Sequence, residues 1–137
     1  MELELVAVAT LRITIARQTR IEGLPAGVRL VGEAASCDLD GEQVRARQAG
    51  TSSDWLTLHG DGSVSVDARL LLATSGGSLT VTYRGKGAAL PATGAPVYIV
   101  PTFETDDPDL AWLNTIQGVG KGIRDGSSLV YQIYQLA

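Results

Sequence analysis

The sequence predicts an all-β protein, an antiparallel barrel of roughly eight to ten strands with one short α-helix near residues 108–114. Three observations predict it: apolar and polar residues alternate over long stretches, turn-forming dipeptides separate these stretches, and only one segment carries helix-start signals. With 137 residues and a hydrophobic fraction of 45%, the chain is long enough to bury a core. We therefore expect residues 1–137 to form one domain.

The first third of the chain predicts long strands. Over residues 3–15 the odd-numbered positions are all apolar, whereas Glu4, Thr10, Arg12 and Thr14 lie at even positions. A period of two indicates a strand with one apolar face. Turns are expected at residues 23–27 and 38–41, with a second strand starting at Val28 and a further extended segment over residues 43–48.

The middle of the chain predicts a β meander. Strands are expected over residues 54–58, 63–74 and 79–84, because Gly-containing turns at 59–62 and 76–77 separate them. Residues 85–96 are rich in glycine, proline and alanine, which indicates a longer loop, one that could lie over an opening. The next strand, residues 97–105, contains Pro101 and should be irregular there.

The end of the chain predicts the helix and a closing hairpin. Asp107 stands at the N-cap position and Pro108 at the first helical position. Two strands, residues 115–124 and 127–136, follow and are joined by Asp125-Gly126, a dipeptide typical of tight hairpins.

Composition excludes several function classes. The net charge of −4 and the pI of about 4.8 give no basic face, so we expect neither nucleic acid nor an anionic membrane surface as partner. Polar residues interrupt the first apolar stretch too often for a signal peptide or membrane span. Cys37 is the only cysteine, which excludes an intrachain disulfide and fits a reducing compartment, so we expect a cytoplasmic protein.

Several motifs in the last 80 or so residues resemble the DUF3237 family, also called UPF0311, which comprises small bacterial and fungal proteins without a generally established activity. The matching pieces are Asp54-Trp55, residues 62–72 with Asp67-Ala68-Arg69, residues 81–85, Phe103-Glu104-Thr105, residues 111–114, Gly118-Val119-Gly120 and residues 130–134. Residues 33–39 depart from the glycine-rich stretch and phenylalanine that the family usually has before its Asp-Trp pair. The resemblance implies an antiparallel barrel around a central cavity and implies no reaction.

Asp67 and Arg69 are the first candidates for chemistry. They lie two apart on one strand and so share a face, opposite an apolar stripe of five side chains: Val64, Val66, Ala68, Leu70 and Leu72. If the stripe packs against a partner, the pair points into the barrel, where Arg69 would bind a ligand oxygen. If the stripe is the core, the pair is solvated, which is the commoner arrangement.

Asp54 is the candidate acid or base, because a carboxylate against the indole of Trp55 could have a raised pKa. Its alternative role is to cap a turn after Ser52-Ser53. Tyr83 and Trp112 are candidate pocket walls or core residues. Asn114 could contact a ligand or cap the helix, and Glu104 could face the cavity.

These candidates predict a small-molecule-binding barrel, which could be a cyclase, isomerase or lyase of secondary metabolism acting on a largely apolar carbonyl- or carboxylate-bearing metabolite. Arg69 would bind oxygen, Asp54 or Tyr83 would donate or accept a proton, and the two tryptophans would form walls. Asp67 is a further candidate catalytic residue, although burial beside Arg69 would lower its pKa and disfavour it as a general acid. We expect no organic cofactor and no metal, since the carboxylate spacing provides too few ligands. The alternatives are a carrier without turnover and an oligomeric structural barrel. A symmetric homodimer through the apolar stripe is the default oligomer.

Overall fold

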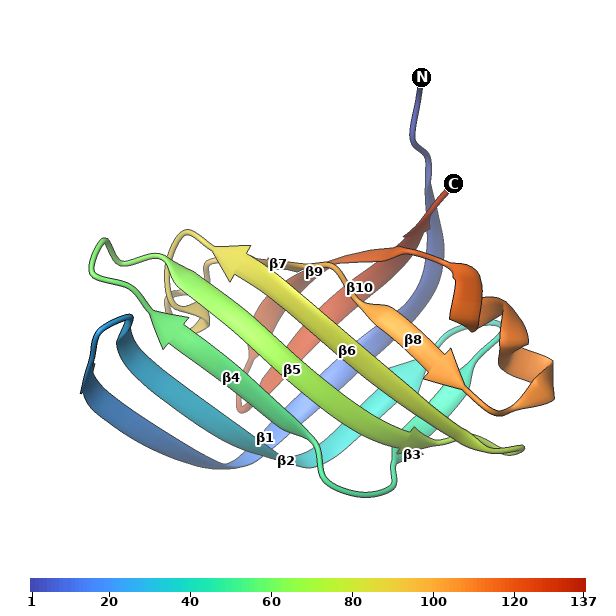
Figure 1. Ribbon diagram of the computed structural model, residues 1–137, viewed down its shortest axis with the longest axis horizontal. Coiled ribbons are helices and arrows are strands. Elements are labelled where there is room, and N and C mark those ends of the chain that lie inside the picture. Colours follow the sequence, from blue (N-terminus) through green and yellow to red (C-terminus); the bar gives the residue numbers. More distant parts are fainter.

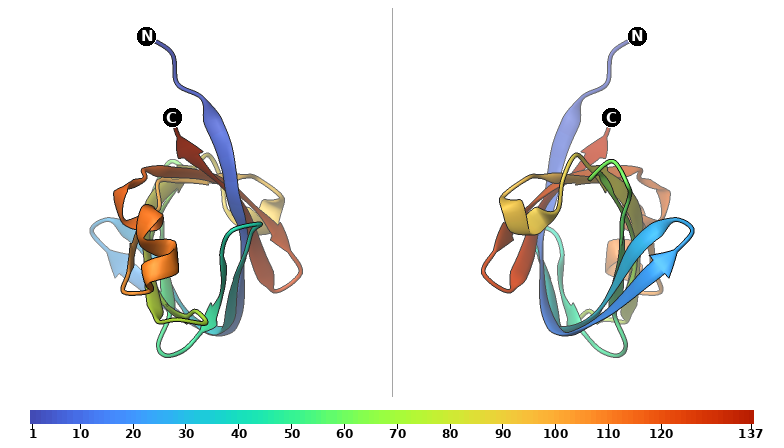
Figure 2. Two further views of the ribbon diagram at one scale, coloured as in Figure 1. Left: turned by 90° about the vertical axis from the view of Figure 1, so that its right-hand side faces the viewer. Right: turned by 90° about the vertical axis from the view of Figure 1, so that its left-hand side faces the viewer.

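The computed structural model describes residues 1–137 as one ten-stranded antiparallel sheet (Figure 1). The strands are β1 (Leu5–Leu24), β2 (Gly27–Asp40), β3 (Arg45–Gln48), β4 (Ser53–Leu58), β5 (Val64–Ala73), β6 (Ser78–Gly87), β7 (Val97–Ile99), β8 (Thr102–Thr105), β9 (Gly118–Asp125) and β10 (Ser128–Leu136). Eight of them close into a ring in the order β1, β2, β4, β5, β6, β7, β9, β10 and back to β1. Figure 2 looks along this ring and confirms the predicted barrel.

The interior is filled by apolar side chains, which occupy every second position along the strands. On β5, Val64, Val66, Ala68, Leu70 and Leu72 are buried while the residues between them are not. The apolar stripe is therefore core, which is one of the two placements that the sequence left open, and it is not available as a dimer interface. Burying it inside the ring removes it from water without any partner chain.

Two long strands shape the ring. β1 has 20 residues and pairs with β10 along its first half and with β2 along most of its length. Its register shifts between Ala7 and Ala9 and again around Ile15, irregularities that let a long strand bend around the barrel. β2 continues through Asp40, where the sequence predicted a turn from Asp38.

The predicted strand over residues 97–105 is two strands. β7 ends at Ile99 and β8 begins at Thr102, so the interruption falls at Pro101 as expected. Both pair with β6, β7 near its end and β8 near its start.

One end of the barrel is closed by the predicted helix, η2 (Pro108–Thr115), which is a 3₁₀-helix rather than an α-helix. Its Leu110 and Leu113 are buried in the core. The carboxylate of Asp107 caps the helix by accepting from Asp109 N at 3.0 Å and also accepts from Thr74 Oγ1 at 2.7 Å. The cap thus ties η2 to the end of β5.

The opposite end carries the loop over residues 88–96, which contains the short 3₁₀-helix η1 (Pro91–Thr93). This loop and the tip of the β1–β2 hairpin lie at the left of Figure 1, whereas η2 lies at the right. No helix of the structure has the length and apolar character needed to cross a membrane.

Candidate functional site

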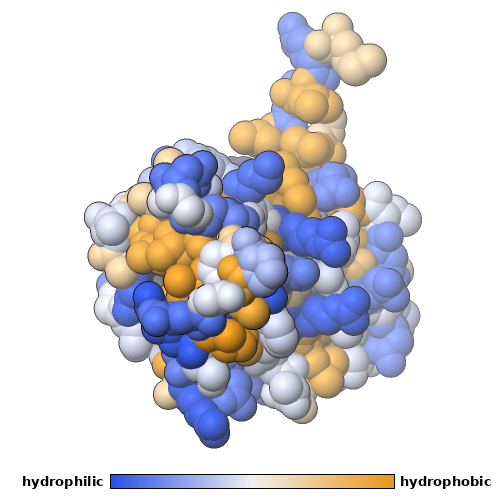
Figure 3. Space-filling model, turned by 60° about the vertical axis from the view of Figure 1, so that its left-hand side comes forward, coloured by the Kyte–Doolittle hydropathy of each residue, from blue (hydrophilic) through white to orange (hydrophobic).

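A pocket of about 380 Å³ opens at the barrel end that η1 flanks. We call it the mouth pocket. Apolar and polar side chains both line it. The apolar set is Ile15, Ala16, Leu30, Leu56, Leu90, Pro91, Ala92 and Leu129, and the polar set is Arg17, Gln18, Asp54, Arg124, Ser127 and Ser128. Figure 3 brings this end forward and shows hydrophobic atoms gathered in a hollow with hydrophilic atoms around it. An apolar cavity with a few polar groups is the usual form of a small-molecule site.

Asp54 reaches this pocket because of its parity on β4. It pairs with Gly32 on β2 and with Ala68 on β5, and it shares its inward direction with Leu56 and Leu58. The side chain is 8% exposed and its Oδ1 has no hydrogen-bond partner. Burial, with a smaller contribution from the negative charge of Asp67, raises the pKa of this carboxyl to about 7.

The predicted cause of that raised pKa is wrong, although its direction is right. Trp55 points to the outer face of the barrel and is 46% exposed, so its indole does not enclose the carboxyl. The ionised form of Asp54 is disfavoured by removal from water into the barrel. Near neutral pH both protonation states of Asp54 are therefore populated, as acid–base catalysis requires.

Two tyrosines lie in the interior beside Asp54. The rings of Tyr83 on β6 and Tyr131 on β10 are 5.5 Å apart between centroids and inclined at 55°. Both are fully buried, and neither hydroxyl has a hydrogen-bond partner. Burial raises the pKa of both phenols, and the charge of Asp54 raises it further, so both remain protonated donors.

Gly122 makes room for Tyr131. The two residues face each other across the β9–β10 pair, and a Cβ at position 122 would lie 2.3 Å from the ring of Tyr131. Gly118, Gly120 and Gly122 all point inward on β9. Part of this glycine-rich run therefore makes room for an aromatic side chain. The run lies within a strand, whereas the glycine-rich loop of a phosphate site would come directly before a helix.

Cys37 and Gln48 are two further residues with buried polar atoms. Burial raises the pKa of the Cys37 thiol to about 11, so it stays protonated and a poor nucleophile. Gln48 Nε2 donates to Ala34 O at 3.1 Å, while Gln48 Oε1 has no partner. No group of three or more His, Cys, Asp or Glu side chains is arranged to hold a metal ion.

The structure does not bring Asp67 and Arg69 into the site. Both side chains are on the outer face of β5, where Asp67 lies 3.7 Å from Arg84 in an exposed ion pair. A ligand in the mouth pocket touches neither residue, because the pocket lining contains neither. The solvated alternative is therefore the one that the structure adopts.

The remaining predicted residues lie elsewhere. Trp112, in η2, packs against the core at the closed end of the barrel. Asn114 Oδ1 accepts from Thr105 N at 2.8 Å, which is a structural contact. Glu104 is on the outer face of β8 and exposed. Of the predicted site residues, only Asp54 and Tyr83 are brought together inside the barrel.

Sequence reasoning missed Tyr131 and Arg124. Tyr131 shares the parity of Leu129 and Ile133, which marks the inward face of its strand and could have identified it. Arg124 precedes the Asp125-Gly126 turn, and its Nε donates to Gly126 O at 2.9 Å. Arg124 also lines the mouth pocket, a placement that only the closed barrel reveals.

Comparisons with known proteins agree with this fold. The family model described as "Protein of unknown function (DUF3237)" matches residues 3–136, nearly the whole chain, so the protein belongs to that family. No curated protein matches the chain.

Several solved structures are similar to this chain in fold. A conserved protein of unknown function from Rhodopseudomonas palustris is 20% identical, with a TM-score of 0.90 over 100% of this chain and 99% of that one. A beta-barrel like protein from Acinetobacter baumannii is 23% identical, with a TM-score of 0.88 over 100% and 98%. An enzyme from Penicillium herquei is 21% identical, with a TM-score of 0.75 over 99% and 94%. At these identities the likeness establishes the fold alone.

Proposed function

We propose that this DUF3237 protein binds a small, largely apolar carbonyl- or carboxylate-bearing molecule in the mouth pocket and catalyses a proton transfer on it, with Asp54 as acid–base group. One observation carries the proposal: a buried carboxyl whose pKa is raised to about 7 lines a pocket that also offers apolar side chains and the guanidinium of Arg124. Perturbed carboxyls in enclosed pockets are characteristic of acid–base sites.

Isomerisation is the reaction type that this arrangement supports best. Ionised Asp54 removes a proton from a carbon next to the ligand carbonyl, and the electron pair moves onto the carbonyl oxygen to give an enolate. When a carbon–carbon double bond of the ligand adjoins that carbon, the enolate is a dienolate, and the protonated carboxyl returns the proton to the far carbon of that double bond. The carbonyl re-forms and the double bond moves into conjugation with it. The atoms and electrons balance without a redox partner. Lyase or cyclase chemistry would start from the same proton removal.

We assign to Arg124 the oxygen-binding role that was expected of Arg69. It lines the same pocket as Asp54, and a guanidinium there would bind a ligand carboxylate or stabilise the enolate oxygen. Tyr83 and Tyr131 do not line the pocket. They lie deeper in the interior, where neither phenol hydroxyl makes a hydrogen bond, so we assign them no direct part in the proton transfer.

Proton exchange tests this proposal without the natural substrate. The probe is 2-tetralone, an apolar ketone with acidic α-hydrogens, incubated with the protein in deuterium oxide and followed by NMR. The native protein should accelerate deuterium uptake, and the rate should rise with pH toward a plateau above about pH 7, where Asp54 is ionised. Asp54→Asn should lower the catalysed rate by about 10²–10⁴-fold.

Arg69→Ala is the matched control, because Arg69 is a cation on the outer face and should leave the exchange rate unchanged. If 2-tetralone binds, as read from its line broadening, but exchanges no faster than in buffer, the protein is a carrier without turnover. If Asp54→Asn exchanges like the native protein, another group is the base and the proposal fails.

A further inference from the structure

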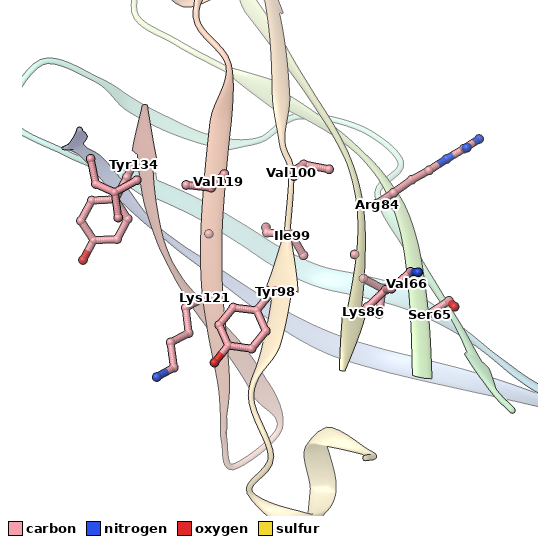
Figure 4. A pocket seen from close by; sticks show the side chains of 13 residues that line it. Ser65, Val66, Arg84, Lys86, Tyr98, Ile99, Val100, Val119, Lys121 and Tyr134 are labelled. Carbon is pink, nitrogen blue, oxygen red and sulfur yellow. The ribbon is translucent and has the colours of Figure 1, made fainter. Parts of the chain in front are cut away.

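A second hollow, of about 810 Å³, lies on the outer face of the barrel, and neither interior phenol lines it. We call it the outer groove. Figure 4 shows side chains of β6, β7, β9 and β10 around it, among them Tyr98, Val100, Val119 and Tyr134. Tyr98 is 54% and Val100 52% exposed, so large apolar side chains face water here. A contiguous exposed apolar patch of this kind marks an interaction surface.

The charge of the outer groove is opposite to that of the whole protein. Arg84, Lys86 and Lys121 line it, and no acidic residue does, although the chain carries a net charge of −4. Lys121 Nζ stands 6.0 Å from the centre of the Tyr98 ring. The groove therefore suits an occupant that is both apolar and acidic.

The chain itself carries a segment of that chemistry. Residues 1–5 alternate acidic and apolar side chains, with Glu2 and Glu4 between Met1, Leu3 and Leu5. Figures 1 and 3 show this segment, the N-terminal arm, projecting away from the barrel. Leu3 is 70% exposed, so its side chain lacks a packing partner within its own chain.

The base of the arm is fixed beside the groove. Glu4 N donates to Ala137 O at 2.9 Å, and Ala137 N donates to Glu4 O at 3.0 Å. Leu5, the next residue, is itself part of the groove lining. Arm and groove are thus neighbours on one surface, and a two-fold axis passing near Leu5 would bring each arm to the other copy's groove at the same time.

We propose that two copies of this chain form a homodimer by exchanging N-terminal arms. Leu3 of one copy packs on Val100 and Val119 of the other, while Glu2 and Glu4 approach Lys86 and Lys121. The contact is isologous and buries the exposed apolar side chains of both elements. It does not depend on the proposed function, because the outer groove contains neither Asp54 nor Arg124.

Sedimentation velocity tests the exchange. The full chain should sediment at about twice its 14.4 kDa mass, and Leu3→Asp or Val100→Asp should each raise the dimer dissociation constant at least about tenfold, because each places a charge in an apolar contact. Ile21→Asp is the control: it changes an exposed apolar residue at the β1–β2 hairpin tip and should leave the dimer intact.

Charge reversal identifies the partners. Lys86→Glu with Lys121→Glu should weaken the dimer, and adding Glu2→Lys with Glu4→Lys to the same chain should restore it. Circular dichroism verifies that each variant is folded. The proposal is overturned if the native chain is a monomer at every concentration, if Leu3→Asp leaves a dimer unchanged, or if the second reversal fails to restore it. A monomer whose groove binds dodecanoate would instead mark a site for an anionic amphiphile.

Discussion

The two ends of the barrel use the same sheet for different purposes. At one end η2 inserts Leu110 and Leu113 into the core, and the Asp107 cap fastens the helix to the sheet. At the other, open end η1 stands beside the mouth pocket, whose lining includes Asp54.

The difference indicates at which end this fold can tolerate a buried carboxyl that lowers its stability. A carboxyl that burial pushes toward neutrality destabilises the protein whenever it is ionised. The closed end contributes apolar burial that offsets this loss of stability. The open end contains Asp54, the carboxyl that causes it. The following predictions test that division.

Asp54→Asn should have the largest effect, seen as a changed pH dependence of stability. The pKa of Asp54 rises from 3.8 to about 7 on folding, so the folded state binds more protons between those values. The free energy of unfolding should therefore fall as pH rises from about 4 to 7, by up to roughly 4 kcal/mol from this group, and level off above. Asp54→Asn should lack that decline in urea titrations at pH 4 and pH 8.

Asp67→Asn provides the control for this measurement. Asp67 contributes less to the raised pKa of Asp54 than burial does, and its side chain is exposed. Most of the decline should survive this substitution. Parallel stability curves for the native protein and Asp54→Asn would show that Asp54 does not titrate as described.

Leu113→Ala should have the next largest effect, at the closed end. Leu113 is fully buried, so truncating it should lower the free energy of unfolding by about 3 kcal/mol. The matched substitution at the open end is Leu90→Ala, where a partly buried side chain should cost about 1 kcal/mol.

The affinity for 2-tetralone should show the reverse order, with the larger effect at Leu90 and the smaller at Leu113. Leu90 lines the mouth pocket and Leu113 does not, so only Leu90→Ala should weaken 2-tetralone binding. Urea denaturation and NMR line broadening measure the two quantities. If Leu113→Ala weakened binding as much as Leu90→Ala, the two ends would not be separate in function.

Tyr83→Phe should have the smallest effect on stability. The Tyr83 hydroxyl is buried without a hydrogen-bond partner, so removing it breaks no such bond and should change the free energy of unfolding by less than about 1 kcal/mol. Tyr134→Phe, on the outer face, is the control. A loss above about 2 kcal/mol would indicate that the hydroxyl has a partner, such as a buried water.

The barrel could be predicted from the sequence because period-two patterning and turn chemistry are local signals. Asp125-Gly126 marked its hairpin, and Pro101 marked the interruption between β7 and β8. The 3₁₀ type of η2 could not be read locally, because N-cap and proline signals are common to both helix types.

The site was only partly predictable, because sequence patterning does not show which strands meet across a closed ring. Asp54 could be identified as a polar residue sharing the parity of Leu56 and Leu58. Trp55 and Arg69 were assigned to the site because of their residue types. Their positions in the strand alternation place both of them on the outer face instead. Arg124 reaches the mouth pocket only because β9 and β10 turn at the same end of the barrel as the η1 loop.

The β1–β10 seam has a consequence for how the protein folds. Thr10 Oγ1 donates to Gln132 Oε1 across 122 positions of the chain, and every pairing between these strands spans a comparable separation. Contacts so distant in sequence form slowly, and on a ribosome they must wait until the last strand has emerged. Tyr131 belongs to that last strand, so the interior around Asp54 is completed only when the ring closes. The proposed acid–base site should thus be among the last parts of the protein to form.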